Sequence, residues 1–168
     1  MFIDAVKAKP NIVLGLATGS SPLETYENMI KDHQEKGTDY SGVVTFNLDE
    51  YIGLEGTHSQ SYRYFMNTSL FNGLNIPLDQ TNVPSGIGDV NEICKAYEEK
   101  ITSVGGIDFQ LLGIGTNGHI GFNEPGTSFD TRTHVTALTQ ETIEGNARFF
   151  ESEDSVPKKA VTMGIQTI

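Results

Sequence analysis

Short apolar runs alternate with longer amphipathic segments along this chain of 168 residues. Residues 11–17, 43–48 and 107–114 are apolar runs of strand length, and residues 135–138 and 160–164 are shorter runs of the same kind. Apolar runs of this length, bounded by turn residues, are typical of buried strands. The sequence therefore predicts strands at these five places.

The first predicted helix covers residues 22–36, where apolar residues recur at helical spacing. Ser21 and Glu24 have the spacing of a capping box, and Pro22 would occupy the first helical position. Gly37 follows the last periodic residue and would end the helix. We therefore expect Ser21 to cap the amino end of this helix.

Three further helices are predicted, over residues 61–70, 90–104 and 139–150. Asp89 and Glu92 have capping-box spacing at the start of the second of them. Helices that alternate with strands indicate an α/β fold, with a mostly parallel sheet flanked by helices on both faces. Because a domain typically holds about 100–200 residues, we expect one domain over the whole chain, 1–168.

In such a sheet, ligands bind outside the carboxyl ends of the strands. This rule places residues 18–21, 49–51 and 115–124 on one rim, where the candidate chemistry is concentrated. The chain stops after residue 168, where a further helix would be expected to begin. We therefore expect the fold to lack its C-terminal part.

The charge of the chain narrows the function classes. Twenty-two acidic residues against eleven basic ones give a formal net charge of −11, so neither nucleic acid nor an anionic membrane is an expected partner. Cys94 is the only cysteine, so no intramolecular disulfide can form. No apolar run approaches the roughly 18–20 residues of a membrane span, and no signal peptide is visible at the N-terminus. We expect a soluble cytoplasmic protein.

The turn after the first strand is a candidate anion site. Thr18, Gly19, Ser20 and Ser21 supply three hydroxyls and a flexible backbone at the start of a helix, where free N–H groups attract anions. No lysine stands before the Ser/Thr positions, so this is not a Walker A loop. The turn either binds a phosphate or is a plain helix cap.

The second candidate is the acidic pair Asp49 and Glu50, at the end of the second strand. Carboxylates on the ligand rim can act in acid–base catalysis. Adjacent strand residues point to opposite faces, so we expect only one of the two to reach the site. The alternative is a helix cap next to a solvated acid.

The third candidate is the glycine-rich stretch 113–126. Residues 113–118 match G-x-G-x-x-G after a strand, but the continuation has no helical period, which disfavours a dinucleotide site. His119 and Glu124 remain, and a histidine tuned by a nearby carboxylate exchanges protons near neutral pH. Without a carboxylate partner, His119 would be a structural histidine.

A metal site is not expected in this sequence. His33, His58 and His134 are scattered along the sequence, and no HExxH motif is present.

Arg148, in the last predicted helix, is either a surface ion-pair partner or the bidentate guanidinium that a phosphate site in an acidic protein needs.

Taken together, these motifs closely resemble the glucosamine-6-phosphate deaminase family, also called glucosamine-6-phosphate isomerases. The motifs are LGLATGSSP at 14–22, FNLDEY at 46–51, SY at 61–62, GIGTNGHIGFNEPG at 113–126 and NARFF at 146–150. The resemblance covers essentially the whole chain, and the loop around His119 is its most specific part. It implies a Rossmann-like fold of the deaminase/isomerase type, a sugar-phosphate substrate and no metal or organic cofactor.

The resemblance also implies roles for individual residues. Asp49 would be the base that moves a proton between C2 and C1 of the opened sugar. His119 would exchange the proton needed to open the pyranose ring, assisted by Glu124 and Asn117. The turn at 18–21 and Arg148 would hold the 6-phosphate. The products would be fructose 6-phosphate and ammonia.

The chain departs from the family pattern at two residues. Some members carry Asp in place of Asn117, and an amide can orient His119 but cannot accept a proton. Allosterically activated members carry arginine in place of His134, so we do not expect activation by N-acetylglucosamine 6-phosphate. Relatives extend further at both ends, which makes this chain either a fragment or a natural truncation.

Two alternatives to an active deaminase stay open. One is a non-catalytic sugar-phosphate-binding fragment, and the other is a hydrolase of the same fold like 6-phosphogluconolactonase. The FNLDEY motif and the NEPG ending of the glycine-rich stretch favour the deaminase. The sequence leaves a homo-oligomer open.

Overall fold

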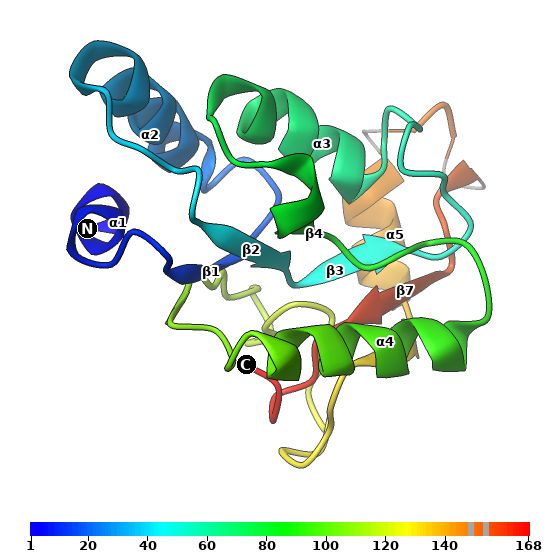
Figure 1. Cartoon of the computed structure of the whole chain (residues 1–168). Helices are drawn as coiled ribbons and strands as arrows, with labels where there is room; N and C mark the ends of the chain where they lie inside the picture. Colours follow the sequence, from blue (N-terminus) through cyan, green and yellow to red (C-terminus); the bar gives the residue numbers. More distant parts are fainter. Residues whose placement is uncertain (148–149, 153–154) are drawn as a thin grey trace.

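Two sheets organise the chain in the computed structural model, which describes residues 1–147, 150–152 and 155–168 (Figure 1). The helices are α1 (Phe2–Ala8), α2 (Leu23–Lys36), α3 (Tyr62–Ser69), α4 (Val90–Ser103) and α5 (Gln140–Ala147). The strands are β1 (Val13–Leu16), β2 (Val44–Asn47), β3 (Asp49–Tyr51), β4 (Thr81–Asn82), β5 (Phe109–Gln110), β6 (His134–Ala137) and β7 (Lys159–Thr162). Two 3₁₀ turns, Phe71–Gly73 and Leu78–Gln80, precede β4.

The first sheet is parallel, with strand order β4-β2-β1-β5. Helices α1, α2 and α3 cover one face, and α4 covers the other (Figure 1). The predicted parallel sheet with helices on both faces is therefore confirmed. The chain runs from β1 through β2 to β4 and then crosses back through α4 to β5 on the other side of β1. This reversal makes the carboxyl ends of β1 and β5 the expected ligand position.

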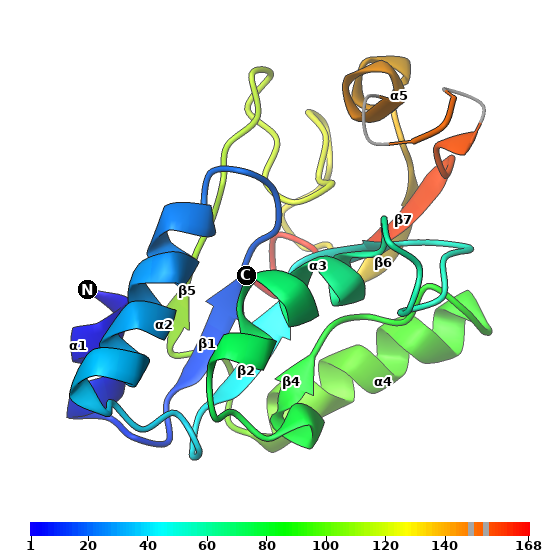
Figure 2. The ribbon, with the colours of Figure 1, turned by 90° about the horizontal axis from the view of Figure 1, so that it is seen from above.

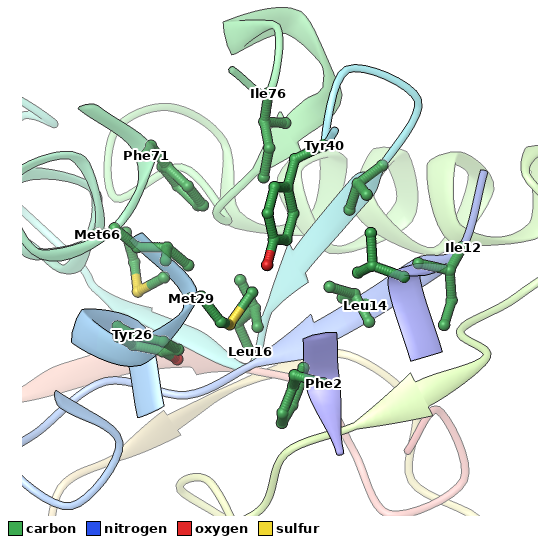
Figure 3. Packing of buried hydrophobic residues seen from close by; sticks show 13 residues of the cluster. Phe2, Ile12, Leu14, Leu16, Tyr26, Met29, Tyr40, Met66, Phe71 and Ile76 are labelled. Atoms are coloured by element: carbon green, nitrogen blue, oxygen red, sulfur yellow. The ribbon is translucent and has the colours of Figure 1, made fainter. Parts of the chain in front are cut away.

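The core explains why β1 reads as a continuous apolar run. All four of its residues are buried, because the strand lies between helices on both faces. Figure 3 shows Leu14 and Leu16 of β1 in one hydrophobic cluster with Tyr26 and Met29 of α2. Burying a side chain of this size contributes roughly 1.5–3 kcal/mol, so this cluster fixes α2 on the sheet.

The second sheet is antiparallel, with strand order β3-β7-β6. The predicted strands at 135–138 and 160–164 exist, but they build this separate sheet. Leu48 is the junction: its N–H donates to the Leu16 carbonyl at 3.3 Å and its carbonyl accepts from the Met163 N–H at 2.7 Å. Asp49 therefore begins a new strand where the two sheets meet.

Two local predictions are wrong. The strand expected at 107–114 pairs only over Phe109–Gln110, and Ile114 is 77% exposed, because the chain turns into the glycine-rich loop. The Ser21 capping box does not form, since α2 begins at Leu23 with Pro22 as its N-cap and no side-chain cap. The Asp89 cap is confirmed: its carboxylate accepts the N–H groups of Asn91 and Glu92.

Candidate active site

A cleft of about 500 Å³ opens where the strand order reverses. The loop after β1, the loop after β5 and α5 lie on the same side of the parallel sheet (Figure 2). Residues from all three line the cleft, together with the β2–β3 junction and α3. The lining includes Thr18, Leu48, Asp49, Tyr62, Thr116, Asn117, His119, Gly121, Phe122, Thr142 and Asn146. Each of the three segments that the sequence predicts on the rim therefore contributes to this cleft.

Asp49 is the buried acid of this cleft. It is 7% exposed, and burial together with the negative charge of Glu50 raises its pKa to about 7. Gly121 lies against it, at a φ of +58° that favours glycine. A Cβ there would lie 2.8 Å from the Thr162 hydroxyl and 3.5 Å from the Asp49 carboxylate. A carboxyl with a pKa near neutrality can both accept and return a proton.

Glu50 points away from the cleft, as strand alternation predicts. It is 1% exposed, and burial raises its pKa. Its carboxylate accepts the N–H groups of Tyr51, Tyr62 and Arg63, each at 2.9 Å. Of the acidic pair, Asp49 alone lines the cleft.

His119, Glu124 and Asn117 come together in the loop after β5. His119 Nδ1 lies 3.8 Å from Glu124 Oε2 and has no hydrogen-bond partner among the residues that the structure describes. Asn117 Nδ2 donates to the same carboxylate oxygen at 2.7 Å, and its Oδ1 accepts the His119 N–H at 3.2 Å. The amide therefore orients both the carboxylate and the histidine backbone.

This loop depends on its glycines and on β7. A Cβ at Gly115 would lie 2.3 Å from the His119 ring, so only glycine admits the ring in this position. The Thr162 hydroxyl accepts the Phe122 N–H at 3.1 Å, and Thr162 pairs with Asp49 in the second sheet. β7 thus links the loop that carries His119 to the strand that carries Asp49. No helix opens within residues 113–133, so the G-x-G-x-x-G stretch does not lead directly into a helix.

A second hollow, of about 460 Å³, adjoins the first. Thr18, Tyr62 and Asn146 line both, so the two are direct neighbours. Its wall includes Gly19, Ser20, Ser21, Ser59, Gln60, Ser61 and Phe65. Gly19 has a φ of +97°, which turns the chain at the end of β1. The predicted anion turn therefore opens onto a cavity, and Arg148 lies outside the described residues.

Helix α5 closes one side of the cleft through two polar contacts. The Thr142 hydroxyl donates to Glu124 Oε1 at 3.3 Å, and Asn146 Nδ2 donates to the Tyr51 hydroxyl at 2.9 Å. Sequence reasoning gave no role to Thr142, Asn146 or Tyr62. Asn146 and Tyr62 stand in motifs noted above, whereas Thr142 has no local sequence signal.

Within the part of the chain that the structure describes, no cluster of three or more His, Cys, Asp or Glu residues could hold a metal ion. Among the described helices, none has both the length and the apolar character needed to cross a membrane. These two observations concern the described residues only.

Comparison with known proteins gives a consistent match. The family model for glucosamine-6-phosphate isomerases/6-phosphogluconolactonase matches residues 1–150. The glucosamine-6-phosphate deaminase of Geobacillus sp. (strain WCH70) is 57% identical over 169 residues, which cover 100% of this chain and 67% of that protein. The deaminase of Clostridium perfringens (strain 13 / Type A) is 56% identical over 95% of this chain and 66% of its own length. The chain thus spans about two thirds of these curated relatives.

Solved structures with a similar fold give the same result as the sequence comparison. A monomeric glucosamine-6-phosphate deaminase, described as a missing link of the NagB superfamily, superposes with a TM-score of 0.97 at 49% identity. The match covers 99% of this chain and 70% of that one. 6-phosphogluconolactonase from Thermotoga maritima shares the fold, with a TM-score of 0.71, at 19% identity. The chain belongs to the glucosamine-6-phosphate deaminase family.

Proposed function

We propose that this protein converts glucosamine 6-phosphate and water to fructose 6-phosphate and ammonia. The observation that carries the proposal is that Asp49 and His119 line one cleft, which adjoins the hollow beside Ser20 and Ser21. An aldose–ketose rearrangement needs a proton shuttle at adjacent carbons, and the 6-phosphate supplies a remote handle.

The phosphate is held by the turn after β1. Thr18, Ser20 and Ser21 supply hydroxyl donors, and Gly19 lets the backbone approach the anion. We assign Arg148 as the cation of this site, because a guanidinium binds phosphate through two parallel hydrogen bonds. A net charge of −11 opposes the approach of an anion, so capture depends on these local groups.

His119 opens the pyranose ring. The imidazole takes the proton of the anomeric hydroxyl and returns one to the ring oxygen. Glu124 stabilises the imidazolium that forms between these two transfers. Asn117 holds Glu124 in place and cannot itself take a proton.

Asp49 catalyses the isomerisation of the open-chain sugar. The carboxylate removes the proton from C2 of the open-chain sugar and delivers it to C1, while O1 gains a proton and the amino group loses one, which converts the amino aldose to a ketose imine. Water adds to the imine carbon, and ammonia leaves. A carboxyl with a pKa of about 7 is well matched to this two-way transfer.

The reaction is general acid–base catalysis by a hydrolase on a phosphorylated metabolite. We place it in the cytoplasm, where sugar phosphates are retained. The lone Cys94 is compatible with a reducing compartment.

The test is ammonia release from glucosamine 6-phosphate, with fructose 6-phosphate measured in parallel. The wild-type chain should yield both products in equal amounts, and Asp49→Asn should lose at least about 100-fold in kcat, because it removes the base. Wild-type product formation no faster than that of Asp49→Asn would refute the proposal.

Two further assays, run beside the ammonia assay, separate the deaminase from the two alternative functions. Calorimetric binding of a substrate analogue without turnover selects the non-catalytic binder. Hydrolysis of 6-phosphogluconolactone without ammonia from the amino sugar selects the lactonase.

A further inference from the structure

A second buried carboxylate lies next to the proposed base and has no part in the mechanism above. Glu50 is 1% exposed and follows Asp49 directly in β3. Burying a carboxylate is costly unless hydrogen bonds compensate, so its contacts should reveal what it does.

Those contacts fasten the amino end of α3. Glu50 Oε1 accepts the N–H of Tyr62 and Oε2 accepts the N–H of Arg63, the first two residues of the helix. The Ser61 hydroxyl accepts the next N–H, that of Tyr64, at 3.0 Å. Together the two side chains satisfy the first three N–H groups of α3, which have no partner inside the helix.

Tyr62 is the residue through which this anchor reaches the site. Its side chain lines both the cleft and the adjoining hollow. Its ring stacks on Phe122 at an interplanar angle of 10° and lies against Tyr51, with centroids 4.8 Å apart. Displacing the start of α3 would therefore move one wall of the site.

We infer that Glu50 is a positioning residue for the proposed reaction: its carboxylate ties Tyr62 to the strand that carries Asp49 and sets a fixed negative charge beside that base. The role in the reaction rests on the proposed function. Holding Tyr62 in place requires only the acceptor oxygens of Glu50, whereas the effect on Asp49 requires that Glu50 is ionised.

The charged and titratable groups around the pair favour this arrangement. Tyr51, Tyr62 and Tyr97 also lie near Asp49, and their raised pKa values keep them neutral at physiological pH. His119 and Glu141 line the same cleft, with Glu124 behind His119. Burial raises the pKa of Glu50, and the three N–H donors together with Arg63, the cation near it, act against that rise by binding the ionised carboxylate.

Three substitutions separate charge from anchoring. Glu50→Gln removes the charge and keeps one acceptor oxygen, Glu50→Asp keeps the charge and shortens the reach, and Ser61→Ala removes the neighbouring cap without changing charge. The readout is the acid limb of the kcat/KM profile for glucosamine 6-phosphate. Glu50→Gln should move that limb to lower pH by about one pH unit, as expected for loss of a neighbouring buried charge. Glu50→Asp and Ser61→Ala should leave the limb near its wild-type position while lowering the thermal midpoint.

A second readout does not depend on turnover. Carboxyl ¹³C NMR of the folded protein, with the Asp49 signal assigned by its loss in Asp49→Asn, should show the Asp49 midpoint about one pH unit lower in Glu50→Gln. An unmoved midpoint, or an equal shift in Ser61→Ala, would overturn the inference. If the wild type releases no ammonia, the proposed function fails, and the NMR titration still decides whether Glu50 sets the ionisation of Asp49.

Discussion

One methyl group added at Gly115 tests whether the position of the His119 ring governs the reaction. A Cβ at this residue would lie 2.3, 2.5 and 2.6 Å from three atoms of that ring. Ordinary van der Waals contact begins at 3.4 Å, so the ring must move by about 1 Å or more. The side chain of His119 is 30% exposed, which leaves it room to swing toward solvent.

The expected result of Gly115→Ala is a catalytic loss that exceeds the loss of stability. A displacement of about 1 Å of an acid–base group costs on the order of 100-fold in rate. Overpacking typically costs about 1–3 kcal/mol, and a ring that can move outward falls at the low end. We therefore expect kcat for ammonia release to fall about 100-fold and the free energy of unfolding to fall by about 1 kcal/mol.

The matched control is Gly113→Ala, because a Cβ at Gly113 meets nothing within 4 Å. Both variants are measured by ammonia release, urea unfolding and imidazole NMR of His119. The His119 signals should move in Gly115→Ala and stay in place in Gly113→Ala. A Gly115→Ala protein with wild-type kcat and displaced His119 signals would refute the reasoning, since ring position would then not matter.

Three other substitutions test the account. Because folding raises the pKa of Asp49 to about 7, the wild type loses stability as the pH rises from about 4 to about 7. The free energy of unfolding of Asp49→Asn, measured relative to wild type by urea titration, should therefore grow by about 2.5 kcal/mol between pH 5 and pH 8. A difference that does not change with pH would contradict the argument that burial raises this pKa. Tyr26→Phe should lower the free energy of unfolding by about 2 kcal/mol, because the buried hydroxyl donates to the Ala17 carbonyl at 2.5 Å and accepts its N–H at 3.2 Å; an unchanged urea midpoint would count against this. Asn117→Asp places a carboxylate against Glu124 and should move the acid limb of the kcat/KM profile to higher pH, because added negative charge favours a protonated imidazole and His119 must be neutral to accept the anomeric proton; an unmoved limb would argue against His119 as the ring-opening group.

The parallel sheet was predictable because each of its parts has a local signal. Four of the six residues at 43–48 are apolar, and Asp89 has capping spacing three residues before Glu92. The ligand rim followed from the rule on carboxyl strand ends, and it brought the turn at 18–21 and the loop around His119 to one side. These features depend on sequence neighbours or on a general rule of sheet topology.

The second sheet and the contacts across the site were not predictable in the same way. The pairing of Asp49 with Thr162 joins residues more than a hundred positions apart, and no local pattern sets that register. No local pattern sets the contacts of Glu50 with Tyr62 or of Thr142 with Glu124 either, although these residues are only 12 and 18 positions apart. The start of α2 was missed because capping at Ser21 depends on where the chain leaves β1, which tertiary packing decides.

The most direct test of the central claim is the fate of the C2 proton during turnover. Glucosamine 6-phosphate is converted in D₂O, and deuterium at C1 of the fructose 6-phosphate is measured by mass spectrometry and NMR. If a single carboxyl, Asp49, moves the proton within the cleft, part of the wild-type product should carry solvent deuterium at C1, because a proton held on a carboxyl exchanges with water, and Asp49→Asn should form product at least about 100-fold more slowly. Product formation by Asp49→Asn at the wild-type rate, or wild-type product that carries no deuterium at C1, would contradict the account.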